Sequence, residues 1–140
     1  MNDPRFLPFA AVSVVIIYCD IRWLIIPHVV ILPGIILGAV SRIALDGTEP
    51  MAVILELALC LGTGLILFLA AGKRFGWGDV LLAMLVAAVW GLTTALLVLQ
   101  VSALTASLIV GVLMAAGRIP PAALLPWAPF YLGTAVLIMM

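Results

Sequence analysis

Apolar residues fill most of the chain in long runs, and short stretches rich in charge, glycine or proline separate them. A helix that crosses a bilayer needs about 20 mostly apolar residues. Counted on that scale, the runs predict six membrane-spanning helices and no strands. The predicted spans are Phe6–Ile26, His28–Leu45, Met51–Ala71, Asp79–Trp90, a fifth segment that ends near Ala116, and a sixth from Pro126 or Pro129 to Met140.

The boundary between the fourth and fifth spans has the weakest signal. No charged residue follows Asp79 until Arg118, and only Thr, Ser, Gln and Gly interrupt the apolar run. Two short spans with a tight turn near Gly91 fit this length, and a single very long helix is the alternative. The next stretch, GRIPPAALLPWAP, is too rich in proline to form one continuous helix.

The composition indicates an all-α integral membrane protein. The chain is 67% hydrophobic and 9% charged, with a mean hydropathy of +1.43. So few charges cannot cover a water-soluble domain of 140 residues. The formal net charge is zero and there is no basic block, which argues against nucleic-acid binding. The N-terminus lacks a basic region before its apolar run, so we expect a retained span and no signal peptide.

Cysteine and histidine supply little candidate chemistry. Cys19 and Cys60 form no CxxC motif, and we interpret both as apolar residues inside helices. His28 is the only histidine, which excludes a histidine-rich metal site. Glu56 lies inside the third span, where we expect a snorkelling or interhelical hydrogen-bonding role. Gly62 and Gly64 in the same span are predicted helix-packing contacts.

The basic residues predict the orientation in the membrane. With six spans they divide into Arg22, Lys73, Arg74 and Arg118 on one face, and Arg5 and Arg42 on the other. This bias favours the first face as cytoplasmic, with both termini outside. Asp20 and Asp79 then lie at the same cytoplasmic face, although 79 − 20 = 59 positions separate them.

These two aspartates are the strongest candidates for chemistry. An ionisable group at membrane depth is costly, so its presence indicates function. Asp79 follows Gly76-Trp77-Gly78, and glycine allows the tight turn that presents a carboxylate at a helix start. Two carboxylates at one membrane level can serve as a base toward water and an acid toward a carbonyl oxygen.

Each aspartate also has a structural alternative. Asp79 fits a helix N-cap, and Asp20 fits an interfacial acid that is solvated or paired with Arg22. A helix that starts at Asp79 presents its positive dipole end to this carboxylate, whereas Asp20 lies near the negative end of its own helix. We therefore expect Asp79 to act as the base and Asp20 as the acid.

Three motifs occur in order along the chain: Asp20 followed by Ile26-Pro27, then GWGD at 76–79, then the tail LPWAPFYLGTA at 125–135. This order resembles the type IV prepilin peptidase family of GxGD-class membrane aspartic proteases. The tail is similar to that family's (L/I)PFGPFLALG stretch. The resemblance covers nearly the whole chain. It implies a six-span bundle in the inner membrane that cleaves leader peptides of type IV prepilins at the cytoplasmic face.

The resemblance also implies roles for individual residues and partners. Asp20 and Asp79 are the implied catalytic pair, and no metal or organic cofactor is needed. The implied substrate-binding or site-supporting residues are Pro27, His28, Gly76, Trp77 and Gly78. The implied partners are a prepilin or pseudopilin precursor and the lipid bilayer. The length resembles the short form found in tight-adherence (Flp-type) pilus systems. We therefore expect one peptidase domain over 1–140, without the cytoplasmic methyltransferase domain of larger relatives.

Four residues depart from the family pattern. His28 stands where asparagine is usual, and Leu81 replaces a usual lysine after the GxGD motif. Trp127-Ala128 replaces Phe-Gly in the tail. The missing lysine bears on substrate contact or on the electrostatics of the carboxylate pair, and leaves the fold unaffected.

Two other functions are compatible with the same residues. Paired acids at one membrane level also serve proton relays in small transporters, in which Glu56 is the only acid able to extend a path across the bilayer. A non-catalytic membrane scaffold for pilus assembly is the second alternative, and the presence of both aspartates argues against it.

Overall fold

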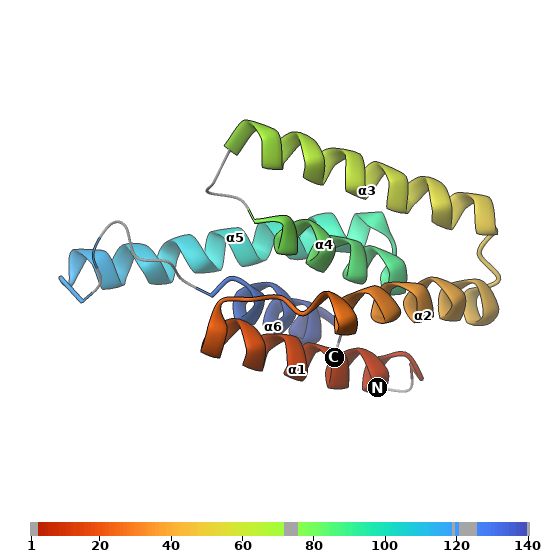
Figure 1. Ribbon diagram of the computed structural model, residues 1–140, viewed down its shortest axis with the longest axis horizontal. Helices are drawn as coiled ribbons and strands as arrows, with labels where there is room; N and C mark the ends of the chain where they lie inside the picture. The colour runs from red at the N-terminus through yellow and green to blue at the C-terminus, as the bar shows by residue number, and fades with distance from the viewer. Residues whose placement is uncertain (1–2, 72–75, 119, 121–125, 140) are drawn as a thin grey trace.

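The described part of the chain forms six α-helices in the computed structural model, and successive helices alternate in direction (Figure 1). That part comprises residues 3–71, 76–118, 120 and 126–139. The helices are α1 Phe6–Trp23, α2 His28–Asp46, α3 Pro50–Ala71, α4 Trp77–Trp90, α5 Leu92–Ala115 and α6 Ala128–Met139. Each predicted segment corresponds to one of them. The all-α prediction is therefore confirmed for the described residues.

The break predicted near Gly91 is confirmed and has a clear cause. Gly91 has φ 94° and ψ 164°, a backbone conformation that is essentially restricted to glycine. A Cβ atom at this position would also lie 3.2 Å from Nη2 of Arg42 and 3.3 Å from Oε2 of Glu56. Local backbone conformation and close packing together end α4 and start α5 here.

Two predicted helix ends are wrong by a few residues. The first helix ends at Trp23 because Leu24 adopts a left-handed conformation, with φ 53°, and its N–H donates to the C=O of Asp20 at 2.9 Å. The fourth helix begins at Trp77, two residues before the predicted start at Asp79.

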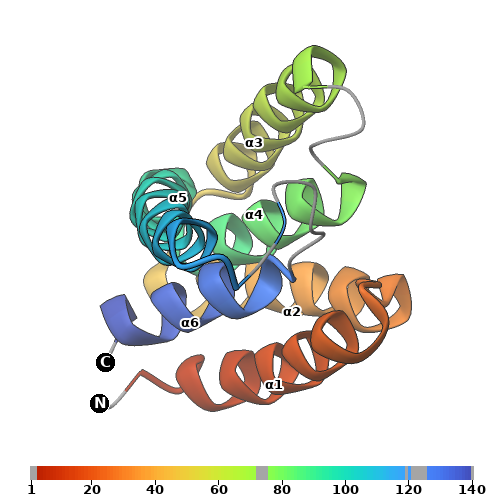
Figure 2. The same ribbon diagram turned by 90° about the vertical axis from the view of Figure 1, so that its left-hand side faces the viewer.

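The short helix α4 lies at the centre of the bundle, and α2, α3, α5 and α6 pack around it (Figure 2). A helix that is apolar on all sides is expected in such a position. Leu81, which stands at the position of the family lysine, is 5% exposed within this core. The buried residues of α4 are Val80, Leu81, Leu82, Leu85, Val86, Ala87, Ala88 and Val89.

Four helices, α1, α2, α3 and α5, are long and apolar enough to cross a membrane. Most of their surface is not covered by the rest of the chain, as expected for helices that face lipid. With 14 and 12 residues, α4 and α6 are shorter than the roughly 17–25 residues of a typical span. The assignment of all six helices as spans stays a prediction.

Glycines on α2 and α3 let both helices approach α4 closely. A Cβ atom at Gly38 would lie 2.7 Å from Cγ2 of Val89, and one at Gly64 would lie 2.5 Å from Cγ1 of Val80. The predicted packing role is thus confirmed for Gly64. It is wrong for Gly62, where an added Cβ has no neighbour within 4 Å.

This difference allows a matched test within α3. We expect Gly64→Ala to destabilise the protein by about 1–3 kcal/mol, because Val80 is β-branched and cannot rotate out of the way. Gly62→Ala should be neutral or stabilising, because it improves helix propensity in open space. Thermal unfolding in detergent micelles compares the two variants. Equal melting temperatures for both would contradict the close α3–α4 contact.

Candidate active site

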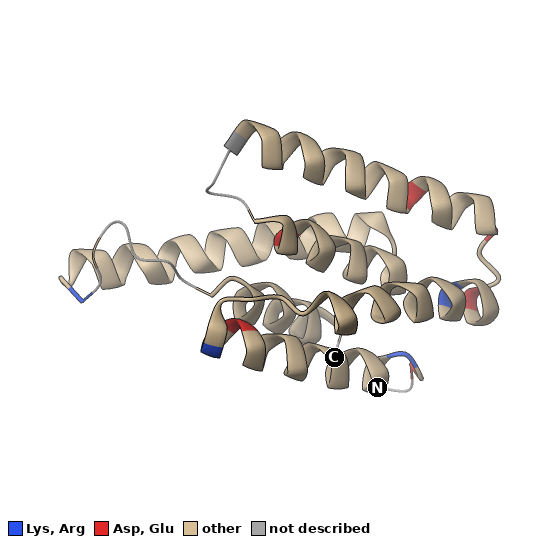
Figure 3. Cartoon of the chain, viewed as in Figure 1, with Lys and Arg blue, Asp and Glu red and all other residues tan. Residues whose placement is uncertain are grey.

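Asp20 and Asp79 lie at the same end of the bundle. The acidic positions of α1 and α4 are found toward this end in Figure 3, where α1 finishes and α4 begins. The fold thus places the two acids that the sequence singles out at one end of the bundle.

Asp20 is held by a helix far away in the sequence. Its side chain is buried at 6% exposure, and its Oδ2 accepts a hydrogen bond from the N–H of Ala128 at 2.8 Å. Ala128 is the first residue of α6. The guanidinium of Arg22, the alternative partner, lies 5.8 Å from the ring centroid of Trp23. Asp20 is therefore buried against the start of α6.

Asp79 is the third residue of α4 and is fixed locally. Its Oδ2 accepts a hydrogen bond from the N–H of Gly76 at 2.9 Å, while its own N–H donates to the C=O of Gly76 at 3.0 Å. Gly76 is thus the N-cap residue, and Asp79 reaches back to it as acidic residues at this position commonly do. The carboxylate is fixed within one turn of the helix start.

One contact joins the two sequence motifs. The side chain of Ile26, from the Ile-Pro pair, lies against Gly78 of the GWGD motif. A Cβ atom on Gly78 would lie 2.5 Å from Cδ1 and 3.1 Å from Cβ of Ile26. The glycine before Asp79 thus makes room for the connection that follows Asp20.

The other predicted site residues lie around this contact at different depths. Pro27 is the N-cap of α2, and its C=O accepts hydrogen bonds from Val30 and Ile31. His28 is exposed at the first position of α2. Trp77 is 41% exposed, and its ring packs edge-on against a residue of α3, with the centroids 6.1 Å apart. The roles of these residues in binding stay predictions.

Sequence reasoning missed the contribution of Ala128 and the packing of Ile26 on Gly78. The similarity of the tail to a family motif marks the Ala128 segment, but it does not identify Asp20 as its partner.

The helix-end argument for the roles of the aspartates is also incomplete. Asp20 lies near the negative end of α1 and at the positive end of α6, so both aspartates face a helix N-terminus.

Charged residues at the opposite end of the bundle form ion pairs. Nη1 of Arg42 lies 2.7 Å from Oε2 of Glu56, and Nη2 lies 3.0 Å from Oε1. Glu56 also accepts a hydrogen bond from the N–H of Leu92 at 3.0 Å. The expected interhelical hydrogen-bonding role of Glu56 is thus confirmed. Arg5 bridges Asp3 and Asp46, and its hydrogen bonds lower the pKa of the Asp3 carboxyl to about 2.

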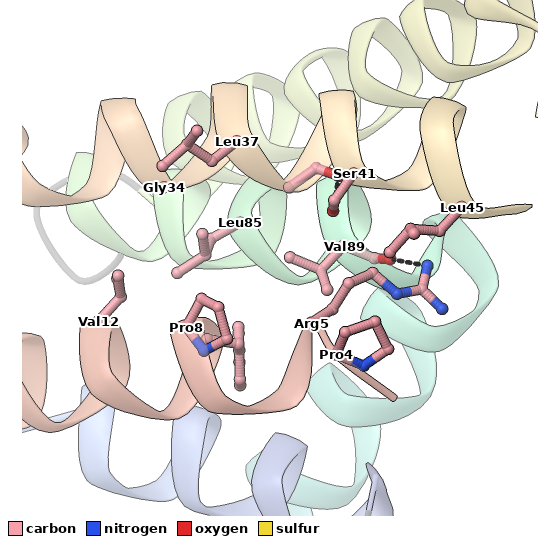
Figure 4. Close-up of a pocket in the computed structure, with 12 residues that line it drawn as sticks. Pro4, Arg5, Pro8, Val12, Gly34, Leu37, Ser41, Leu45, Leu85 and Val89 are labelled. Carbon is pink, nitrogen blue, oxygen red and sulfur yellow. Dashed lines mark hydrogen bonds between the residues drawn. The ribbon is translucent and has the colours of Figure 1, made fainter. Parts of the chain in front are cut away.

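A cavity of about 280 Å³ lies between α1, α2 and α4 and reaches toward the Arg5 end (Figure 4). Its lining is mostly apolar. The hydroxyl of Ser41 donates to the C=O of Gly38, and Arg5 donates to the C=O of Val89. Because its polar lining groups are already bonded, this cavity offers apolar space and no evident catalytic group.

The described residues contain no cluster of three or more His, Cys, Asp or Glu side chains that could hold a metal ion. Lys73 and Arg74, two of the four basic residues assigned to the face of Asp20 and Asp79, lie outside the described residues.

Residues 7–112 match the model of the type IV leader peptidase family. This range includes both aspartates, the Ile-Pro pair and the GWGD motif, whereas the tail at 125–135 lies beyond it. No curated protein and no solved structure matches the chain.

Proposed function

The chain belongs to the type IV leader peptidase family, and we propose that it is an intramembrane aspartic endopeptidase that removes the leader peptide from type IV prepilin or pseudopilin precursors. The observation that carries this proposal is the position of two hydrogen-bonded carboxylates, Asp20 and Asp79, at the same end of an apolar bundle.

The proposed reaction uses both carboxylates and one water molecule. One aspartate takes a proton as the water oxygen bonds to the carbonyl carbon of the scissile peptide, and the other gives a proton to the carbonyl oxygen. When the C–N bond breaks, a proton passes to the leaving amine. A backbone N–H holds Oδ2 of each aspartate, from Ala128 for Asp20 and from Gly76 for Asp79.

We further propose that the site faces the cytoplasm from the inner membrane and that all six helices form one transmembrane peptidase domain over 1–140. Arg22 and Arg118 lie at the aspartate end, whereas Arg5 and Arg42 lie at the other. The short helix α4 is largely enclosed by its neighbours, and α6 packs against α1, α4 and α5, so neither needs to match the full bilayer thickness.

The substrate enters laterally from the bilayer and unwinds at the cytoplasmic rim in this proposal. The carbonyl groups of a helix are engaged in hydrogen bonds, so a scissile peptide must be extended before water can attack it. Gly76, the last residue before α4, and the first two residues of α4, Trp77 and Gly78, lie at this rim. The preceding residues, Gly72 to Phe75, lie outside the described part of the chain.

Leader cleavage of candidate precursors in membranes tests the proposal. The expected product is a shortened pilin whose new N-terminus, determined by mass spectrometry, marks one defined bond. Failure to cut a panel of precursors would contradict the proposal and make a proton-flux assay the next experiment. For the relay alternative, the pairing of Glu56 with Arg42 already occupies the acid that a path across the bilayer needs.

The contact between Ile26 and Gly78 gives a second test. Gly78→Ala forces the new Cβ against Ile26, so the start of α4 and the Asp79 carboxylate must shift. We expect kcat to fall by about tenfold or more, because small displacements of reacting groups are costly. Adding Ile26→Ala to Gly78→Ala should restore part of the loss. If the double variant is no faster than Gly78→Ala, crowding at this contact is not the cause.

A further inference from the structure

The start of α6 and the side chain of Asp20 satisfy each other's hydrogen-bonding groups. The first N–H groups of a helix have no partner within that helix. Ala128 is fully buried at the first position of α6, and its N–H finds an acceptor in Oδ2 of Asp20, 108 positions away in sequence. Asp20 therefore caps α6, and α6 in turn fixes one oxygen of Asp20.

This hydrogen bond also offsets an unfavourable electrostatic interaction between Asp20 and the carbonyl end of α1. Asp20 lies in the last turn and a half of α1, and its own C=O accepts the N–H of Leu24 there. The carbonyl end of a helix is unfavourable for a carboxylate. A buried carboxylate also needs a hydrogen-bond donor to offset the loss of water. The positive end of α6 supplies the donor and opposes the negative end of α1.

A second bond fixes the placement of α6. Tyr131, one turn after Ala128, is buried at 1% exposure, and its hydroxyl donates to the C=O of Ala95 in α5 at 3.1 Å. The tail segment thus contacts α1 through a backbone N–H and α5 through a phenol. Its position relative to Asp20 is set by the fold.

We propose that the N–H of Ala128 is a positioning group for the Asp20 carboxylate in leader cleavage. It holds Oδ2 and thereby directs Oδ1 toward the scissile peptide and Asp79. Ala128 acts through Asp20 and does not itself touch the substrate. This inference rests on the proposed function, because it requires Asp20 to take part in hydrolysis.

Proline at position 128 removes the N–H while keeping the helix. Proline is well tolerated at the first position of a helix, where the N–H has no intrahelical partner. Ala128→Val adds a similar volume but keeps the N–H, so it shares the packing cost. Ala128→Gly keeps the N–H without adding volume. Gly133→Ala, in open space on the same helix, serves as a control outside the site.

The expected result is a selective loss of turnover in one variant. Ala128→Pro should lower kcat by about 10- to 100-fold with KM changed less than about twofold, as expected when a hydrogen bond to a charged group is lost. Ala128→Gly and Ala128→Val should keep most of kcat at a temperature where all variants are folded, as checked by thermal unfolding. Gly133→Ala should match the wild type.

The outcomes separate this inference from the proposed function. If Ala128→Pro turns over as fast as Ala128→Val, or if both lose kcat equally, the N–H does not position Asp20 and the inference fails. That result leaves the proposed function intact as long as Asp20→Asn is inactive. If Asp20→Asn still cleaves the precursor, the proposed function fails with it.

Discussion

Replacing either Asp20 or Asp79 by asparagine is expected to lower kcat for leader cleavage by about 10³-fold or more. Asparagine has the size of aspartate but cannot take up or release a proton in the reaction, and this proton transfer is commonly worth about 10²–10⁴-fold. Its amide oxygen can still accept the N–H of Ala128 or of Gly76. Both variants should therefore fold like the wild type, and the loss should lie in the chemical step.

The measurement is the initial rate of precursor cleavage in membranes that contain equal amounts of each variant. Glu49→Gln makes the same carboxyl-to-amide change on an exposed residue at the other end of the bundle and should keep full activity. The double variant Asp20→Asn/Asp79→Asn should be no slower than either single variant, because residues that act as a unit are not additive.

Two results would contradict the catalytic pair. Wild-type rates in both single variants would make the aspartates structural. Loss of cleavage in only one of the two variants would reduce the pair to a single catalytic aspartate. If the rate losses of the two single variants multiply in the double variant, the two carboxylates act in separate steps.

The helices could be predicted from sequence because their ends have local causes. Gly91 has a backbone conformation that other residues avoid, and Gly47 closes α2 with a positive φ of 65°. Pro27 fixes the start of α2. These residues act on their immediate neighbours, so their effect is visible without knowledge of the tertiary structure.

The arrangement of the helices could not be predicted in the same way. Hydropathy shows that α4 is apolar on every side, but not which four helices surround it. The partner of Asp20 is a backbone N–H of Ala128, and every residue except proline offers such a donor. The pairing therefore has no signature in side-chain chemistry. Asp79, by contrast, has a local partner, because Gly76 is only three residues away in sequence.

The ion pair between Arg42 and Glu56 shows the intermediate case. Glu56 could be recognised as an interhelical hydrogen-bonding residue from its position in an apolar span. The sequence places Arg42 at one face of the membrane but does not identify it as the partner of Glu56. Helix packing then brings α2 and α3 together where α4 ends and α5 begins. Glu56 also accepts a hydrogen bond from the N–H of Leu92 there.

Glu56→Leu is accordingly expected to destabilise the protein by about 1–3 kcal/mol, because it leaves the partly buried guanidinium of Arg42 without its carboxylate partner. The guanidinium of Arg42 then keeps only its hydrogen bond to the C=O of Ala87, at 3.3 Å, among those that the structure shows for it. The N–H of Leu92 loses its acceptor as well. Thermal and denaturant unfolding in mixed micelles measure this loss.

The double variant Arg42→Met/Glu56→Leu distinguishes an unpaired charge from a packing defect. Replacing both members of a buried ion pair by apolar side chains of similar size is often close to neutral. The double variant should therefore be more stable than Glu56→Leu, with a remaining deficit for the N–H of Leu92. Both variants should retain cleavage at low temperature, because the pair lies at the opposite end from Asp20 and Asp79. If the double variant is less stable than Glu56→Leu, packing rather than the unpaired Arg42 charge accounts for the loss.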